Sequence, residues 1–130
     1  MKEIAKTPQY EIAIDETKNR VYLKVLGYWR NAESVANYIS DWRKTLALLK
    51  PNFTLLTDLT TMLTHPAEVL GIHKQAQELL TENGLRHTAE VAPKDFVTAF
   101  QLSKVAKSSQ MPVRQFPTVA EAEAFLDTLI

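Results

Sequence analysis

Residues 53–66, FTLLTDLTTMLTHP, decide the fold. Residues 53–59 are mostly apolar and have the length of a buried strand, whereas the residues that follow are polar and rich in threonine. Pro66 suits the first turn of a helix, because its fixed φ angle is compatible with a helix and an N–H there would have no partner. The stretch therefore predicts a strand, a loop and a helix in succession.

The same order recurs on both sides of this stretch. Apolar residues that alternate with polar ones, or that run together, predict five strands at residues 10–15, 21–26, 53–59, 87–91 and 113–116. Apolar residues at helical spacing predict four helices, which begin near Asn31, Pro66, residues 93–95 and Thr118. In the third helix, Phe96, Phe100 and Val105 are expected to point inward.

Strands that alternate with helices predict parallel pairing, and only the first two strands are close enough in sequence to form an antiparallel hairpin. The expected fold class is α/β, with a mixed, mostly parallel five-stranded sheet, a leading antiparallel hairpin and four helices mainly on one face. Residues 1–9 are expected to be a loose segment. We expect either this segment or a second subunit to cover part of the other face.

Composition limits the classes of function. A chain of 130 residues suffices for a single domain, residues 1–130, and its 15 basic residues balance its 15 acidic ones. Without a basic excess we expect neither a nucleic-acid partner nor a strong membrane attraction. The absence of cysteine excludes disulfides and thiolate catalysis. No stretch resembles a signal peptide or a membrane span, so a cytoplasmic location is expected.

Three predicted loops lie at one edge of the sheet. Ligands of open α/β sheets bind beyond the carboxyl ends of the strands, where residues 28–30, 58–65 and 92–95 are expected to meet. The candidate ligand or partner residues at this edge are Tyr28, Trp29, Arg30, Asp58, Thr60, Thr61, Thr64 and His65.

Trp29 has two interpretations. If it is exposed, its indole would stack on a small apolar ligand while Arg30 holds an anionic one. If it is buried, it would pack against Val35 and anchor the entry to the first helix. We favour the buried arrangement.

Metal and catalytic motifs are absent from the sequence. The three histidines, His65, His73 and His87, do not have the spacing of metal ligands on one helix. No general base is paired with an activated nucleophile. We therefore predict no metal site, no cofactor and no catalytic residue.

Several strings resemble the SpoIIAA-like family, whose fold is that of STAS domains such as the anti-sigma factor antagonists. They are VYLKVLG at residues 21–27, FTLLTDL at residues 53–59 and VRQFPTVAEAEAFL at residues 113–126. The resemblance runs from Tyr10 to Ile130. It implies a small bacterial cytoplasmic domain that binds a partner or a ligand.

One loop departs from the family pattern. The phosphoregulated antagonists carry an Asp-Ser-Ser-Gly type of motif after the third strand, and a partner kinase phosphorylates its serine. The corresponding loop here, residues 60–66, has no Asp-Ser pair and no glycine. Thr64 is the remaining candidate phosphosite, at a helix N-terminus that tolerates a phosphate. The alternative is that Thr64 or His65 only caps that helix.

Three functions are consistent with these observations. We predict a non-enzymatic interaction or regulatory module that binds a protein partner or self-associates, with a dimer as one form. The first alternative is a carrier of a small molecule or lipid, which an internal apolar cavity would favour. The second is an enzyme that uses the loop after the third strand, which would require Asp58 in a closed cleft.

Overall fold

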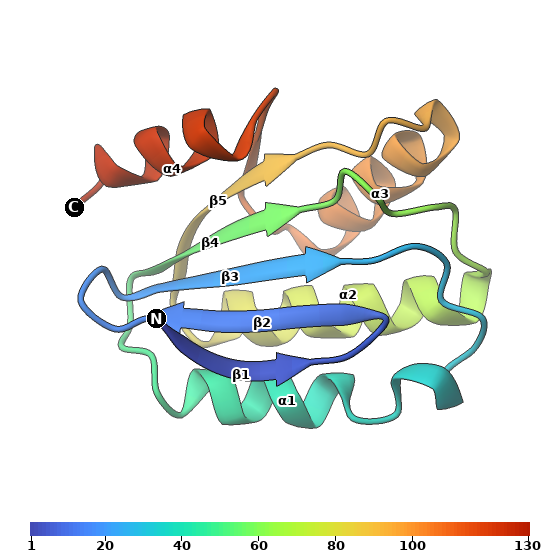
Figure 1. The fold of residues 1–130 in the computed structure, drawn as a ribbon, viewed down its shortest axis with the longest axis horizontal. Coiled ribbons are helices and arrows are strands. Elements are labelled where there is room, and N and C mark those ends of the chain that lie inside the picture. The colour runs from blue at the N-terminus through green and yellow to red at the C-terminus, as the bar shows by residue number, and fades with distance from the viewer.

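The computed structural model describes residues 1–130, which form a six-stranded sheet in the order β1-β2-β3-β4-β5-β6 (Figure 1). β1 (Lys2–Lys6), β2 (Tyr10–Asp15) and β3 (Arg20–Val25) pair antiparallel. β4 (Phe53–Asp58), β5 (Leu85–Val91) and β6 (Val113–Phe116) extend the sheet in parallel. The predicted mixed, mostly parallel sheet with a leading hairpin is confirmed.

The N-terminus differs from the prediction. We expected five strands and a loose segment at residues 1–9, but Lys2–Lys6 form a sixth strand at the edge of the sheet. Its pairing with β2 shifts in register between Glu3 and Ala5. The two apolar residues of this strand, Ile4 and Ala5, are adjacent, so its sequence lacks the alternation of apolar and polar residues that predicts a strand. Both side chains are only half-buried.

The helices occupy both faces of the sheet. α1 (Tyr38–Leu46), α2 (Ala67–Glu82) and α3 (Phe96–Ser109) lie on one face, and α4 (Val119–Asp127) lies on the other (Figure 1). The prediction of helices mainly on one face is therefore confirmed. α4, rather than the N-terminal segment, covers part of the second face. It follows the last strand and need not return to the sheet, so its side is not fixed by a crossover. None of the helices is long and apolar enough to cross a membrane.

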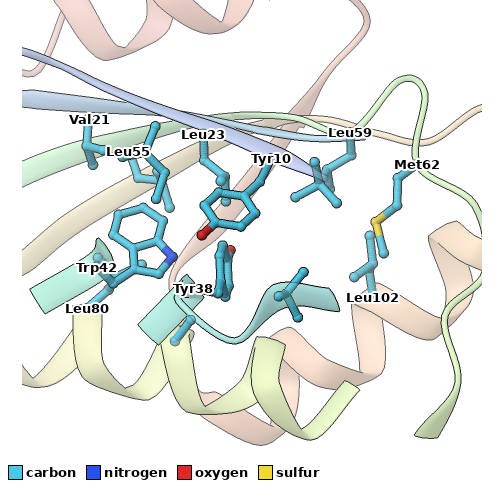
Figure 2. Packing of buried hydrophobic residues seen from close by; sticks show 14 of the residues in the cluster. Tyr10, Val21, Leu23, Tyr38, Trp42, Leu55, Leu59, Met62, Leu80 and Leu102 are labelled. Atoms are coloured by element: carbon cyan, nitrogen blue, oxygen red, sulfur yellow. The ribbon is translucent and has the colours of Figure 1, made fainter. Parts of the chain in front are cut away.

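The main core lies between the sheet and the three helices. Side chains that alternate along β2 and β3, such as Tyr10 and Leu23, meet Tyr38 and Trp42 of α1 (Figure 2). A smaller core on the second face joins the sheet to α4 and contains Leu56, Ala89, Val91, Ala122 and Leu126.

The first helix is shorter than predicted. The Asn31 side chain accepts a hydrogen bond from the Ser34 N–H, at 3.0 Å, next to a short 3-10 turn at Glu33–Val35 whose N-cap is Ala32. The α-helix begins only at Tyr38.

The first turns of α3 are rotated relative to the prediction, whereas Val105 is buried as predicted. Phe96 is 81% exposed and Phe100 is 55% exposed, whereas Thr98 and Leu102 point inward. The cause is the cap: Asp95 accepts hydrogen bonds from the N–H and the hydroxyl of Thr98, at 3.1 and 2.6 Å. This cap fixes the rotation of the first turn so that Thr98 faces the protein and the two phenylalanines face solvent.

A buried arginine attaches α4 to the sheet. Arg20 of β3 has no exposed surface, and its Nε donates to Thr54 Oγ1 at 3.0 Å. Its Nη1 donates to carboxylates of both Glu123 and Asp127, at 2.8 Å each. The hydroxyl of Tyr22 donates to Glu123 at 2.6 Å. Burial, together with this bond, raises the pKa of Tyr22 to about 12.

We expect Arg20→Met to lower the free energy of unfolding by about 2–3 kcal/mol, because it removes the buried donor of both carboxylates and leaves Thr54 Oγ1 without its arginine partner. Chemical denaturation measures this loss, and faster amide exchange in α4 would locate it. Lys18→Met is the matched control, since Lys18 contacts the same two carboxylates from a half-exposed position. An equal loss in both variants would contradict the assignment of Arg20 as the attachment point.

Candidate functional site

The carboxyl ends of β3, β4 and β5 meet at one edge, as the right-hand side of Figure 1 shows. Gly27 has a φ of 60°, a left-handed conformation that lets the chain turn directly after β3. Its carbonyl accepts a hydrogen bond from the Leu63 N–H at 3.0 Å, and the Leu59 N–H donates to the Val91 carbonyl at 3.0 Å. Backbone bonds therefore hold the three loops together.

Two histidines that sequence reasoning treated separately form a pair beneath these loops. His65 Nε2 lies 3.0 Å from the Gly27 carbonyl oxygen, and His65 Nδ1 lies 3.0 Å from His73 Nε2. A carbonyl can only accept, so His65 Nε2 carries the hydrogen and donates it. His65 Nδ1 then accepts from His73 Nε2–H. The geometry thus assigns one neutral tautomer to His65 and makes His73 the donor of the pair.

Trp29 stacks on this pair. Its ring centroid lies 5.1 Å from that of His65 and 4.6 Å from that of His73, with interplanar angles of 22° and 26°. The indole N–H donates to the Gln9 carbonyl at 2.8 Å, and the side chain has no exposed surface. Trp29 is therefore a buried anchor rather than a platform for a ligand. Its stacking partners are the two imidazoles, which the sequence analysis did not foresee.

Burial keeps the histidine pair neutral. It lowers the pKa of His73 to about 3, and the neighbouring His65 adds to that shift. The pKa of His65 is lowered by the same cause, which the hydrogen bond to Gly27 partly offsets. Protonation of either ring would place an unpaired charge in the core.

The loop between β4 and α2 is fixed to α3. The His65 N–H donates to Gln101 Oε1 at 3.2 Å, and Gln101 Nε2 donates to the His65 carbonyl at 2.9 Å. The Thr64 hydroxyl lies 2.8 Å from Thr98 Oγ1 and 3.2 Å from the Asp95 carboxylate. Both residues therefore connect the loop to the start of α3.

This placement corrects one expectation. Neither Thr64 nor His65 caps α2, because the N-cap position belongs to Pro66 and no side chain bonds there. The extended backbone of Pro66, with ψ of 159°, directs the preceding residues away from the α2 axis and toward α3.

The other predicted residues do not converge on a reaction centre. Asp58 Oδ1 accepts from the N–H and the hydroxyl of Thr60, at 3.0 and 2.8 Å, so this carboxylate is used within its own turn. Asp58 lies on the same sheet face as Leu56 and α4, whereas His65 belongs to the opposite face. Thr61 and Arg30 are exposed. The structure therefore does not bring Asp58 and His65 together.

Five large apolar side chains are exposed on the segments that follow β3, β4 and β5. We call them the carboxyl-edge surface; they are Tyr28, Leu63, Phe96, Val97 and Phe100, each more than half exposed. Tyr28 and Leu63 come from the two joined loops, and the other three come from the first turns of α3. Large side chains of this kind are unusual as a group on the surface of a monomer.

Internal space is small. The cavity between the sheet and α2 has a volume of about 40 Å³ and is lined by residues such as Leu23, Trp42 and His73. It is of a size for a few water molecules and does not accommodate a lipid chain. Among residues 1–130, no three His, Asp or Glu side chains lie close enough to hold a metal ion.

No protein family matches this chain by sequence, and no curated protein matches it either. Solved structures do share its architecture. An uncharacterised protein of the DUF3478 family from Shewanella loihica PV-4, with a SpoIIAA-like fold, superposes with a TM-score of 0.67 at 13% identity. The alignment covers 94% of this chain and 97% of that chain. This chain has the SpoIIAA-like fold.

SiaC of Pseudomonas aeruginosa is also similar, with a TM-score of 0.59 and 19% identity over 89% of this chain and 100% of SiaC. The SpoIIAA-like fold that the sequence strings indicated is thus confirmed over most of the chain. At these identities the similarity concerns the fold alone.

We expect the free energy of unfolding to fall as the pH drops below 6.5, the ordinary pKa of histidine. In this range the unfolded chain binds protons at His65 and His73, whereas the folded pair stays neutral because burial lowers both pKa values. Above this pH the two histidines are neutral in both the folded and the unfolded chain, so they contribute no pH dependence to the free energy of unfolding. His73 should contribute up to about 1.4 kcal/mol per pH unit, with a smaller part from His65. Urea denaturation between pH 7.5 and 5 measures the slope.

His73→Gln provides the control for this slope, since its amide can still donate to His65 Nδ1 but cannot titrate. Burial raises the pKa of Glu90, so this residue makes the free energy of unfolding rise as the pH falls, the opposite of the histidine effect. Glu90 is present in both the natural protein and the variant. If His73→Gln shows the same dependence of unfolding free energy on pH as the natural protein, the conclusion that the folded histidine pair is neutral is wrong.

Trp29→Ala should lower the free energy of unfolding by about 3–5 kcal/mol, because it empties the space between Tyr38 and the two imidazoles. Chemical denaturation gives the value. Arg30→Ala, at the exposed neighbouring position, should change stability by less than about 0.5 kcal/mol. A small effect at Trp29 would show that its side chain is exposed in solution.

Proposed function

We propose that this chain is a cytoplasmic regulatory module without catalytic activity, which acts by binding another protein. The binding region is the carboxyl-edge surface. The single observation that carries this proposal is the exposure of five aromatic and aliphatic side chains on the segments that follow β3, β4 and β5, two of which the His65 bond to Gly27 joins. Aromatic side chains on a preorganised surface are typical of the centre of protein interfaces.

The charges near this surface are suitable for an interface. Arg30 and Lys94 are exposed beside the loops, and the Lys104 ammonium lies 4.7 Å from the centre of the Phe100 ring. A rim of charge around an apolar centre orients a partner and speeds association. The resemblance to STAS domains, which act by binding partners, supports the same conclusion.

Thr64 is the residue through which phosphorylation would change the carboxyl-edge surface. A phosphate on its hydroxyl would be placed against the Asp95 carboxylate, which already accepts hydrogen bonds from Thr98. Like charges repel, so the cap of α3 and the orientation of Phe96 would change together. Phosphorylation at Thr64 would therefore act on binding through α3 rather than through α2.

The alternatives have less support. The small internal cavity does not favour a lipid carrier. An enzyme that uses the β4–α2 loop would need Asp58 near a second reactive group, but Asp58 is bonded to Thr60. A small apolar or anionic ligand at the edge would compete with the protein partner for the same side chains.

The test is quantitative capture of a partner by the natural protein and by a Leu63→Asp/Phe96→Asp double variant, both cross-linked in the native host and analysed by mass spectrometry. We expect the double variant to lose at least about 90% of a reproducible partner, since a charge in the apolar centre opposes burial. Its free energy of unfolding should stay within about 1 kcal/mol, because both side chains are exposed.

Leu48→Asp is the matched control, because Leu48 is an exposed leucine that follows α1, outside the carboxyl-edge surface. It should retain the partner. If the double variant captures as much partner as the natural protein, the carboxyl-edge surface is not the binding region. If the captured protein is a second copy of this chain, light scattering of the purified double variant should show the monomer, and the surface would then serve self-association.

A further inference from the structure

A second groove lies away from the carboxyl-edge surface, between the later turns of α3 and the edge strand β6. Its volume is about 360 Å³, and its lining includes Ser103 and Lys107 of α3, Val113 and Gln115 of β6, and Glu90 of β5. β6 is the last strand of the sheet, so one of its sides pairs with β5 and the other is free. The groove therefore runs along an open strand edge with a helix as its opposite wall.

Glu90 is an unpaired acid in this groove. It is 7% exposed, and the one hydrogen bond to its carboxylate comes from Gln115 Nε2, at 3.2 Å. No lysine, arginine or histidine nitrogen lies within 4.0 Å of it. Buried carboxylates in proteins are generally paired with a cation, because burial without one is costly.

None of the ionisable side chains near Glu90 provides a positive charge for its carboxylate. Lys107 lines the groove but makes no ion pair with Glu90, and Arg114 lies on the other face, 5.1 Å from the centre of the Phe125 ring. On its inner side Glu90 lines the small cavity with Tyr38 and His73, and both of these are neutral. Burial raises the pKa of Glu90, as expected for an acid without a counter-ion.

We propose that this groove binds an extended segment of a partner protein along the free edge of β6, with a lysine or arginine side chain of that segment paired to Glu90. An added strand satisfies the free backbone groups of β6, and its alternate side chains point into the groove. The cation would meet a desolvated carboxylate, where a charge-assisted bond is stronger than at the surface. Complementary charge thus selects a basic segment over a neutral one.

The test uses two blocked pentapeptides, acetyl-Thr-Val-Lys-Val-Thr-amide and the same peptide with norleucine in place of lysine. Each is titrated into the whole isotope-labelled protein and followed by NMR. We expect the lysine peptide to shift the amide signals of Val113 and Gln115 and to bind at least about tenfold more tightly than the norleucine peptide. Equal affinity, no saturable shift up to millimolar peptide, or shifts confined to another surface would overturn the proposal.

Two variants make the result specific. Glu90→Gln should reduce lysine-peptide affinity to the norleucine level. Lys107→Ala should raise it two- to threefold or so, because a like charge is removed from the wall. Lys107 is exposed, so this second variant remains informative if Glu90→Gln fails to fold. Unchanged or weaker binding in Lys107→Ala would contradict the proposal.

The groove is independent of the proposed regulatory function. The Leu63→Asp/Phe96→Asp variant should bind the lysine peptide as the natural protein does, since neither side chain lines the groove. Loss of partner capture with intact peptide binding would separate the two surfaces.

Discussion

The hydrogen bond from His65 Nε2 to the Gly27 carbonyl is the contact on which the arrangement of loops at the carboxyl edge depends. It fixes the tautomer of His65, which in turn decides that His73 donates to it. The backbone of the same residue is bonded twice to Gln101 of α3. One residue thus joins the turn after β3, the loop after β4 and two helices. These bonds connect the segments that carry the exposed side chains of the carboxyl edge.

The sequence predicts the architecture well because periodicity reports burial. The alternation in residues 10–15 and 21–26 and the apolar run at residues 53–59 identify the central strands. Thr118 and Glu121 match a capping box, and Thr118 Oγ1 does accept the Glu121 N–H, at 3.1 Å. β1 escapes this reasoning because an edge strand buries little of either face. The side of the sheet taken by α4 also escapes, because it depends on the pairing of Arg20 with residues about a hundred positions away.

The site is less predictable for a related reason. Placing the loops at the carboxyl edge follows from topology, but the role of each side chain depends on contacts between distant segments. His73 occupies the buried stripe of α2 with Val69, Ala76 and Leu80, at spacings of four and three, which marks it as a core residue. Its partner His65 lies in a loop without periodicity. Phe96 and Phe100 have the spacing of an inward stripe, but the cap at Asp95 and the burial of Leu102 leave them facing outward.

The stacking of Trp29 on two imidazoles also gives the protein a built-in optical reporter. Trp29 and Trp42 are its two tryptophans, and neither has exposed surface. An indole in an apolar, water-free environment emits at shorter wavelength than one in water, and a protonated imidazole in contact with it quenches its emission. Trp42 lies in the main core and makes no ring stacking with either imidazole, so Trp29 is the more direct reporter. A change in emission without loss of the fold would therefore report that the loops at the carboxyl edge have separated from the layer beneath them.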